Sequence, residues 1–342
     1  MGVAYEAEHM EETRVAGCRR SSSATCTSIA TAADRFWHVA SVPSTEGAWS
    51  EQKAVSLEFL MKSLLVALVL FPMLPIFAVA QEGGTVTFVE SALRVIRGAT
   101  VYLGAEGVRL RQGDILENGE GGFAQLELSG GTIAVLGPSS RIFLFRLGSG
   151  AEIVLLSGWL KGEGGTSSGV FRYSSPLLSA STRSGTVVVR SGEEVAEMFV
   201  ESDSANVSPV SPDGNWGHPV SVRSGQFCTR QRGKNVTVSP RPPTTFLDQV
   251  PHAFRDTLPS RLERFSNKKP VELRRDHEVS FGEIQGWLTM APRWSTEFVE
   301  RFQSRLKDPA FREELEKHLS ALPEWEPVLH PEKNAPKTQE PR

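Results

Sequence analysis

The chain has 342 residues, enough for two domains of ordinary size, each with a buried core. Its formal net charge is −3 and its isoelectric point is near 6.2. This composition gives no electrostatic basis for binding nucleic acid or an anionic membrane surface, so neither is expected as a partner.

An apolar stretch at residues 61–80, MKSLLVALVLFPMLPIFAVA, divides the chain. Lys62 precedes an uncharged run that ends in Ala78-Val79-Ala80, the pattern of a secretory signal peptide and its cleavage site. We predict a cleaved leader and a periplasmic or secreted protein. The alternative is a single transmembrane span over residues 64–80 that anchors the chain in the inner membrane, although two prolines interrupt it and a span needs about 17–25 residues.

Residues 1–60 precede this leader and show no convincing hydrophobic period. Their low-complexity stretch RRSSSATCTSIATAADR predicts a non-native or disordered extension upstream of a true start at Met61. Cys18 and Cys26 lie in this extension without a nearby histidine pair, so a zinc site is not indicated. Cleavage would leave Cys228 as the single thiol, and no internal disulfide could form.

Residues 84–239 have the pattern of many short strands separated by glycine-rich turns. Leu126 and Leu128, like Ile133 and Val135, are spaced by two and therefore lie on one side of a pleated strand. Of the 30 glycines, 21 lie between residues 83 and 192, which favours turns and short strands over helices. The predicted strands are 85–89, 93–97, 101–103, 126–128, 133–135, 141–147, 153–156, 181–190, 195–201, 220–223 and 236–239. This spacing predicts an antiparallel β-sandwich or roll.

Four segments within residues 84–192 follow one another in a recognisable order. They are VIRGATV around residue 97, LRQGDIL at 110–116, GEGGFAQLEL at 119–128 and GGTIAVLGPSS at 130–140. Together they resemble the FecR domain. The resemblance implies an all-β module that works outside the cytoplasm in the bacterial envelope. It brings no catalytic residue, because the matching positions are turn and core positions. The best-understood members are membrane-anchored regulators that pass an outer-membrane signal to a sigma factor.

The composition changes at residue 240. The prolines at 240–279 predict an ordered connector without sheet, and a helical period begins at Ser280, whose spacing to Glu283 is that of a capping box. Asp308-Pro309 has the pattern of an N-cap followed by an N1 proline. We therefore predict a small helical module at 280–330 and a disordered tail at 331–342. The fold class is mainly β, a FecR-like sandwich or roll with a helical C-terminal module.

Two glycine motifs imitate catalytic or cofactor signatures. Residues 165–169 match the nucleophile elbow G-x-S-x-G, and residues 119–124 imitate a dinucleotide fingerprint, but neither precedes a predicted helix as its chemistry requires. No histidine after the leader has metal-ligand spacing to a second ligand. Asp276-His277-Glu278 is read as a charged surface run. We expect no catalytic residue, cofactor or metal, and hence no enzyme.

Trp294, Phe298 and Phe302 recur every four residues and form an apolar stripe that needs a partner surface. The stripe is a candidate partner-binding face, although docking onto the chain's own sheet is the commoner use of such a pattern. Trp216, Trp287 and Trp325 could stack on sugar rings, but they are not grouped in the sequence. The prediction is a non-enzymatic envelope module that binds or scaffolds a protein or glycan. The alternative is a FecR-type regulator with residues 1–60 in the cytoplasm.

Overall fold

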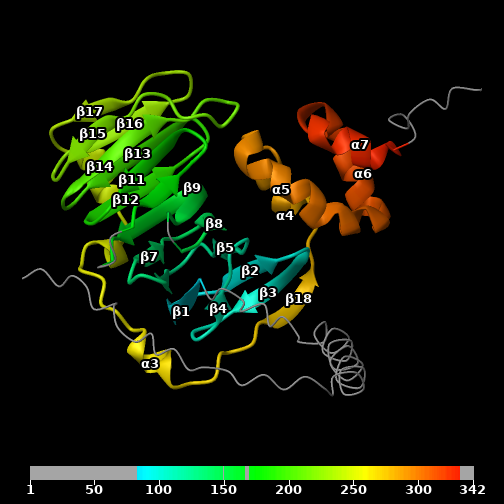
Figure 1. Cartoon of the computed structure of the whole chain (residues 1–342), viewed down its shortest axis with the longest axis horizontal. Coiled ribbons are helices and arrows are strands. Elements are labelled where there is room, and N and C mark those ends of the chain that lie inside the picture. The colour runs from blue at the N-terminus through cyan, green and yellow to red at the C-terminus, as the bar shows by residue number, and fades with distance from the viewer. Residues whose placement is uncertain (1–82, 149, 166–168, 332–342) are drawn as a thin grey trace, which may run out of the picture. The chain divides into compact units, whose positions relative to one another are not determined.

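The computed structural model describes residues 83–148, 150–165 and 169–331 (Figure 1). The predicted extension at 1–60, the leader at 61–80, the serine of the G-x-S-x-G motif and the tail from 332 onward lie outside the described residues. No helix within the described ranges is both long enough and apolar enough to cross a membrane.

Strand is the commonest regular structure of the described chain. The strands are β1 (Gly84–Val89), β2 (Leu93–Arg97), β3 (Thr100–Gly104), β4 (Arg109–Leu110), β5 (Ile115–Asn118), β6 (Ala124–Leu128), β7 (Ile133–Leu136), β8 (Arg141–Arg146), β9 (Glu152–Glu163), β10 (Phe171–Ser174), β11 (Leu178–Thr182), β12 (Thr186–Ser191), β13 (Val195–Val200), β14 (Ser204–Pro209), β15 (Val220–Arg223), β16 (Phe227–Gln231), β17 (Thr237–Ser239) and β18 (Arg274–Glu278).

These strands form two mostly antiparallel sheets that share β9. Sheet A has the order β4-β1-β6-β7-β9-β12-β13-β16-β17. Sheet B has the order β18-β3-β2-β5-β8-β9-β10-β11-β14-β15, in which β9 and β10 are parallel. From β10 onward the chain alternates between the sheets, one hairpin at a time. The predicted mainly β, antiparallel sandwich with C-terminal helices is confirmed.

Strand β9 passes from one sheet to the other through a bend at Gly158. Residues 152–157 pair with β8 in sheet B, and residues 158–163 pair with β12 in sheet A. Gly158 has φ of +92°, and a Cβ at this position would lie 2.6 Å from the Cα of Ser140. Glycine is therefore required at the bend by both conformation and space. The sequence predicted only residues 153–156 as this strand.

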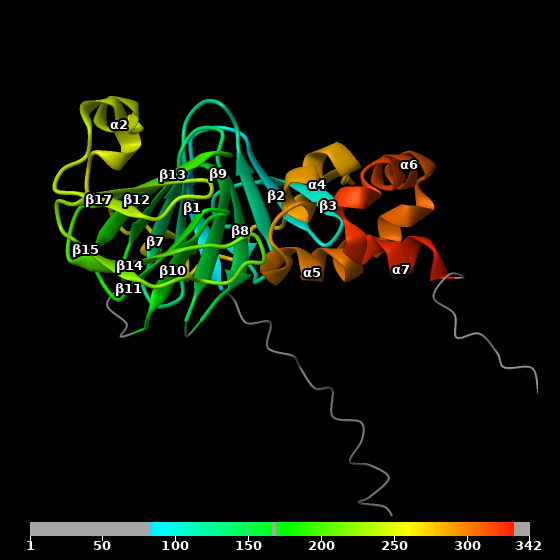
Figure 2. The same cartoon turned by 90° about the horizontal axis from the view of Figure 1, so that it is seen from above.

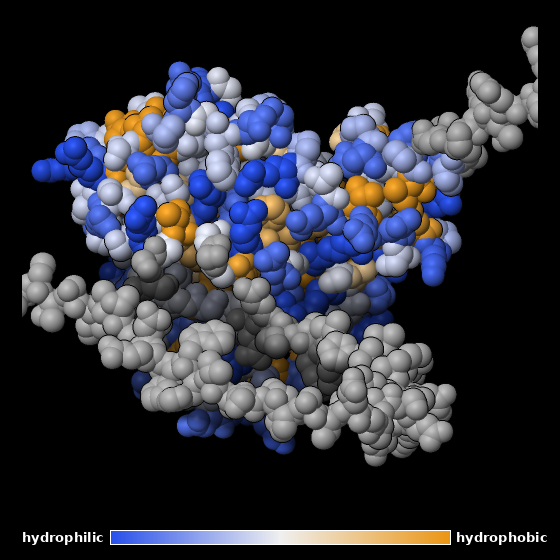
Figure 3. All heavy atoms as spheres, viewed as in Figure 1, coloured by the Kyte–Doolittle hydropathy of each residue, from blue (hydrophilic) through white to orange (hydrophobic). Residues whose placement is uncertain are grey.

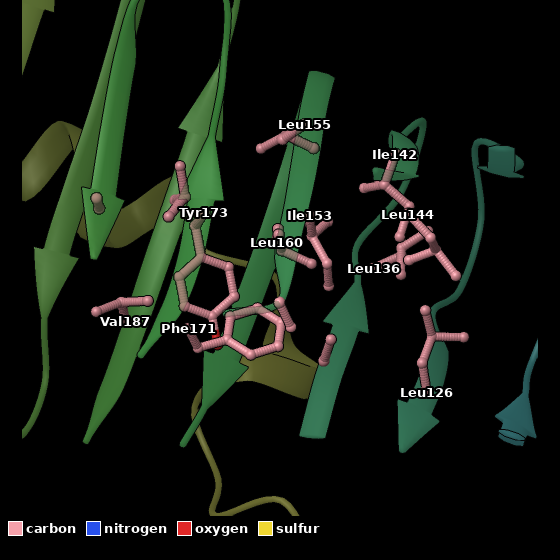
Figure 4. Packing of buried hydrophobic residues seen from close by; sticks show 14 of the residues in the cluster. Leu126, Leu136, Ile142, Leu144, Ile153, Leu155, Leu160, Phe171, Tyr173 and Val187 are labelled. Carbon is pink, nitrogen blue, oxygen red and sulfur yellow. The ribbon is translucent and has the colours of Figure 1, made fainter. Parts of the chain in front are cut away.

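The main core lies between the two sheets. Alternate residues of each strand point inward, as Ile142 and Leu144 do on β8 and Ile153 and Leu155 do on β9, and all four are at most 1% exposed. Figure 4 shows these side chains meeting Leu126 and Leu136 from sheet A and the paired rings of Phe171 and Tyr173.

The C-terminal helices cover part of the outer face of sheet B. They are α4 (Phe281–Leu288), α5 (Pro292–Phe302), α6 (Pro309–Lys317) and α7 (Glu326–Leu329), with 3-10 turns at 303–307, 319–321 and 323–325. A second apolar cluster, the helix-facing core, joins them to outward residues of β2, β3, β5, β8 and β9. Figure 2 shows these helices beside β2, β3 and β8. The Asp308 carboxylate accepts from the Ala310 amide at 3.1 Å, so the predicted cap of α6 is confirmed.

Residues 240–278, which we call the strap, run from the outer face of sheet A to the edge of sheet B. α2 (Thr244–Gln249) and a 3-10 turn at 252–254 place Phe246 and Phe254 on sheet A, where both are at most 1% exposed. α3 (Glu263–Ser266) follows, and β18 then pairs with β3. The prediction of a connector without sheet is therefore wrong at residues 274–278. β18 is charged and mostly exposed, so its sequence carries no apolar signal for a strand.

Candidate binding surface

The aromatic stripe predicted as a partner-binding face lies in the interior. Trp294, Phe298 and Phe302 are each 0% exposed and belong to the helix-facing core. The ring of Phe298 lies 5.1 Å from that of Phe143 on β8 and 6.4 Å from that of Trp287 on α4. These residues hold α5 on sheet B, so a partner could reach them only by displacing the helices.

The other residues singled out in the sequence lie in a turn, in an ion pair or in the core. Gly119 and Gly121 lie in the turn before β6, as predicted. His277 lies on β18 and contacts Asp276 at 3.2 Å and Glu283 at 2.9 Å. Among the described residues no group of three or more His, Cys, Asp or Glu side chains is placed to hold a metal ion. Cys228 is a buried free thiol, and burial raises its pKa to about 12.

A row of polar side chains crosses the part of sheet B that the helices do not cover. The registers place Arg172 opposite Ser181, Ser181 opposite Asn206, and Asn206 opposite Ser221, on β10, β11, β14 and β15. Neighbours of these residues on each strand point into the core between the sheets, and they are Phe171, Tyr173, Ala180, Ala205, Val207 and Val222. The four side chains therefore face outward, and we call them the polar row. Asn206 and Ser221 are exposed, and Ser181 is half-buried.

Three arginines and a tryptophan lie at the inner end of this row. Trp216 is 37% exposed, and the Cζ atoms of Arg172 and Arg293 lie 3.8 Å and 4.2 Å from its ring centroid. The Cζ atoms of Arg293 and Arg146 lie 5.9 Å and 5.7 Å from the ring centroid of Phe145. These contacts fit cation–π stacking. We call Arg146, Arg172, Arg293 and Trp216 the arginine–tryptophan cluster.

One carboxylate is buried beneath this cluster. Glu152 is 1% exposed and is paired with Arg172 in register. It accepts hydrogen bonds from the Ser174 hydroxyl at 2.7 Å and from the Trp294 indole at 3.3 Å, and the nearest contact to Arg293 is 3.5 Å. Much of its accepting capacity is therefore used by neutral donors. Burial lowers the pKa of Arg172, opposed by the charge of Glu152 and reinforced by the charges of Arg293 and Arg146.

A cleft of about 470 Å³ lies against the same two segments that carry Trp216 and Arg293. Ser211 and Pro212 line it from the loop after β14, and Met290 and Ala291 from the start of α5. Arg141, Ser157 and Arg232 add polar groups. Arg141 is engaged with Glu117 at 2.8 Å, whereas Arg232 is largely exposed and contacts Glu194 at 3.0 Å. The cleft therefore lies beside the cluster and does not contain it.

Local sequence patterns give little indication of this surface. The alternation Phe171-Arg172-Tyr173-Ser174 places Arg172 on the face opposite to the two aromatic rings, which is the one local signal available. Trp216 and Arg293 join Arg172 through a loop and a helix that are distant in sequence, and no local pattern shows this. Of the three tryptophans considered for sugar stacking, Trp287 and Trp325 are 0% exposed and only Trp216 reaches the surface.

Comparison with known proteins gives weak similarities only. No family model matches the sequence, and no curated protein matches it. Two crystal structures of a candidate anti-sigma factor from Parabacteroides distasonis ATCC 8503 are similar in part. The first has a TM-score of 0.33 at 10% identity and covers 37% of this chain and 59% of that one. The second has a TM-score of 0.34 at 11% identity and covers 50% and 87%. This chain thus spans less than two thirds of the first of these proteins, and neither similarity is close enough to assign a family or a function.

Proposed function

We propose that this chain is an exported, non-enzymatic, FecR-like module of the bacterial cell envelope that binds a glycan or protein partner through the polar row. The observation that supports this most directly is which parts of the two sheets are covered by the helices and the strap and which part is not. Helices lie on β2, β3, β5, β8 and β9 of sheet B, and the strap lies on sheet A. The polar row remains accessible on a rigid scaffold, which is the usual arrangement of a binding surface.

Binding to the isolated cell envelope tests this function. The full chain is mixed with the envelope fraction and the bound amount is measured by sedimentation. Asn206→Trp places a bulky ring on the exposed row and is expected to reduce binding at least tenfold. Thr237→Trp, on an exposed residue of β17 in sheet A, is the matched control and should leave binding unchanged. Equal binding by the two variants would contradict a role for the row.

The membrane-anchored regulator remains the second candidate. It differs from the exported module because residues 61–80 would be retained as an anchor and not cleaved. N-terminal sequencing of the native protein separates the two. A chain that begins at Gln81 supports the exported module, whereas a chain that retains the apolar segment supports an anchored protein. Either result leaves the binding test on the polar row valid.

A further inference from the structure

We infer that the arginine–tryptophan cluster binds the anionic group, a carboxylate or a phosphate, of an acidic polysaccharide that lies along the polar row. The inference rests on the proposed function for the row as a binding surface and adds the chemistry of the partner. It is argued from the hydrogen bonding of the three arginines, from their charge and from the groups that continue the surface.

The three guanidinium groups of the cluster are held in place but leave most of their donors open. Arg172 donates to the Ser179 hydroxyl at 3.4 Å, and Arg293 reaches Glu152 at 3.5 Å, while its buried Nε has no partner. Arg146 is exposed, and its guanidinium makes no hydrogen bond to the side chains or carbonyls of the described residues; it lies against the ring of Phe145. Aromatic stacking fixes the planes of these side chains without using their N–H groups.

Two buried or half-buried arginines elsewhere in the fold, Arg301 and Arg97, show the contrast. Arg301 donates to the carbonyls of Gly98, Gly113 and Ile96 at 2.9 Å, 2.5 Å and 2.7 Å. Arg97 binds both oxygens of Asp114 at 2.8 Å and 2.7 Å. The cluster differs from these two because its three guanidinium groups lie together on the rings of Trp216 and Phe145 with most of their N–H donors unused. A planar fork with free donors matches a carboxylate or phosphate, which can accept two parallel hydrogen bonds.

The charge of the cluster also favours an anion. Three arginines face one buried carboxylate, Glu152, and the nearby Glu297, so the positive charges are in excess. Burial disfavours the charged form of Arg172 and lowers its pKa; the charge of Glu152 opposes this shift, and the charges of Arg293 and Arg146 add to it. A bound anion would neutralise this repulsion, and its binding would weaken as salt screens the interaction.

The groups beyond the cluster favour a sugar polymer over an acidic peptide. Hydroxyl and amide side chains continue from Arg172 through Ser181 and Asn206 to Ser221, on strands about 4.8 Å apart, which gives a row of roughly 14 Å. Asn206 and Ser221 are exposed and make no side-chain hydrogen bond within the described residues. The row is open and polar and is flanked by the partly exposed indole of Trp216, a combination that suits the hydroxyl groups and rings of sugars.

Direct binding to defined polymers tests this inference. The full chain is titrated by calorimetry with polygalacturonic acid, which carries carboxylates, and with its methyl-esterified form, which presents the same sugars without the charge. We expect the acid form to bind at least tenfold more tightly. A phosphate-substituted glycan tests whether a phosphate is the anion that binds. Inorganic phosphate tests whether the free ion binds without the sugar polymer. Poly-glutamate tests an acidic peptide of similar charge.

Variants locate the site. Arg146→Gln removes an exposed guanidinium that the fold does not use, and it should weaken binding of the acidic polymer at least tenfold. Arg172→Gln should do the same. Arg232→Gln, an exposed arginine outside the cluster, removes the same charge and should change affinity less than twofold. Circular dichroism and thermal unfolding show whether each variant keeps the native fold.

Three results would overturn the inference. The first two are equal binding of the charged and esterified polymers and unchanged binding by Arg146→Gln. The third is that poly-glutamate binds as tightly as any acidic polysaccharide, which would identify a protein partner. The proposed function fails separately: it requires that Asn206→Trp lose binding to the envelope fraction. If that loss is observed and no acidic glycan binds, the function stands and only the chemistry assigned here is wrong.

Discussion

Lys161 is a buried cation that joins the strap to sheet A. The residue is 2% exposed in β9, and its Nζ donates to the carbonyls of Phe254 and Asp256 at 2.6 Å and 3.1 Å. The Glu201 carboxylate lies 2.9 Å away and balances the charge. A lysine in this position is stable only because each of its three donors has an acceptor.

Lys161→Met should therefore destabilise the protein through the polar groups that it leaves behind. Two strap carbonyls and Glu201 would lose their donor, and unsatisfied buried groups cost about 1–3 kcal/mol. Urea unfolding followed by tryptophan fluorescence measures the loss. Lys234→Met, on an exposed lysine, is the control and should stay within about 0.5 kcal/mol of the native protein. Equal midpoints for the two variants would contradict the role of Lys161.

Gly158 permits a second prediction at this scale, because two causes can be separated there. Gly158→Ala introduces a Cβ 2.6 Å from the Ser140 backbone at φ of +92°. Gly225→Ala introduces one at φ of +79° with no heavy atom within 4 Å. Backbone strain is common to both variants. The crowding at Gly158 should therefore make Gly158→Ala less stable than Gly225→Ala by about 1–3 kcal/mol. Chemical denaturation of both variants measures the difference, and equal losses would show that the bend tolerates a side chain.

At the scale of elements, β18 and α4 are joined by a charged contact. Glu283 near the start of α4 accepts from the Ser280 amide and hydroxyl at 2.8 Å each and contacts His277 at 2.9 Å. Arg94 also pairs with this carboxylate. The hydrogen bond to Glu283 raises the pKa of His277, against desolvation. Burial opposes ionisation of Glu283, but its hydrogen bonds from Ser280, His277 and Arg94 prevail and lower its pKa to about 2.

The pKa shifts of this pair predict opposite pH dependences. The raised pKa of His277 means that its contribution to stability is full below the unfolded value of about 6.5 and is lost as the pH rises through the folded value. His277→Gln should therefore lower the melting temperature more at pH 5.5 than at pH 8.5. Glu283 behaves in the opposite way, and the destabilisation by Glu283→Gln should shrink as the pH falls from about 4.5 toward 2. Melting temperatures across this range provide the check, and a histidine effect independent of pH would contradict the pairing.

Local patterns in the sequence predicted many elements and failed for definite reasons. Residues 220–223 and the capped start of α4 coincide with the structure, because alternation and capping are local signals. β16 (Phe227–Gln231) was missed because it lacks alternation, with both Phe227 and Cys228 buried. β18 was missed because its place is set by main-chain pairing with β3. The arginine–tryptophan cluster depends on the packing of a loop and a helix, which only the tertiary structure gives.

At the scale of the whole described fold, the helices and sheet B share one apolar core. The outward side chains of sheet B in this core are apolar and buried, and they are Ile96, Val101, Ile115, Phe143, Phe145 and Val154. The helices on their own would be too small to bury a sufficient core. Sheet and helices therefore depend on each other, although each has regular local structure. Figure 3 shows that most of one face of the protein is hydrophilic, with hydrophobic residues gathered near β17 and near α6 and α7.

Removal of the helices should consequently make the remaining chain self-associate. A chain that ends at Val279 would expose the apolar outer face of sheet B, and large exposed apolar patches promote association. Size-exclusion chromatography with light scattering should show oligomers or aggregates. A chain that ends at Pro331 keeps all four helices and should match the full protein in elution and melting temperature. A monomeric, folded product ending at Val279 would show that the sandwich needs no cover.

The strap also affects the order in which the protein can mature. A ribosome makes residues 84–239 before the segments that pack on the outer faces of their sheets. Those segments, the strap from α2 onward and the C-terminal helices, begin at residue 244. While about one hundred further residues are synthesised, the nascent sandwich exposes apolar side chains on the outer faces of its sheets. The segments that will bury these side chains have not yet been made. Newly made chains would therefore require a chaperone or export in an unfolded form. Residues 240–331 therefore decide when the sandwich of residues 84–239 reaches its native state.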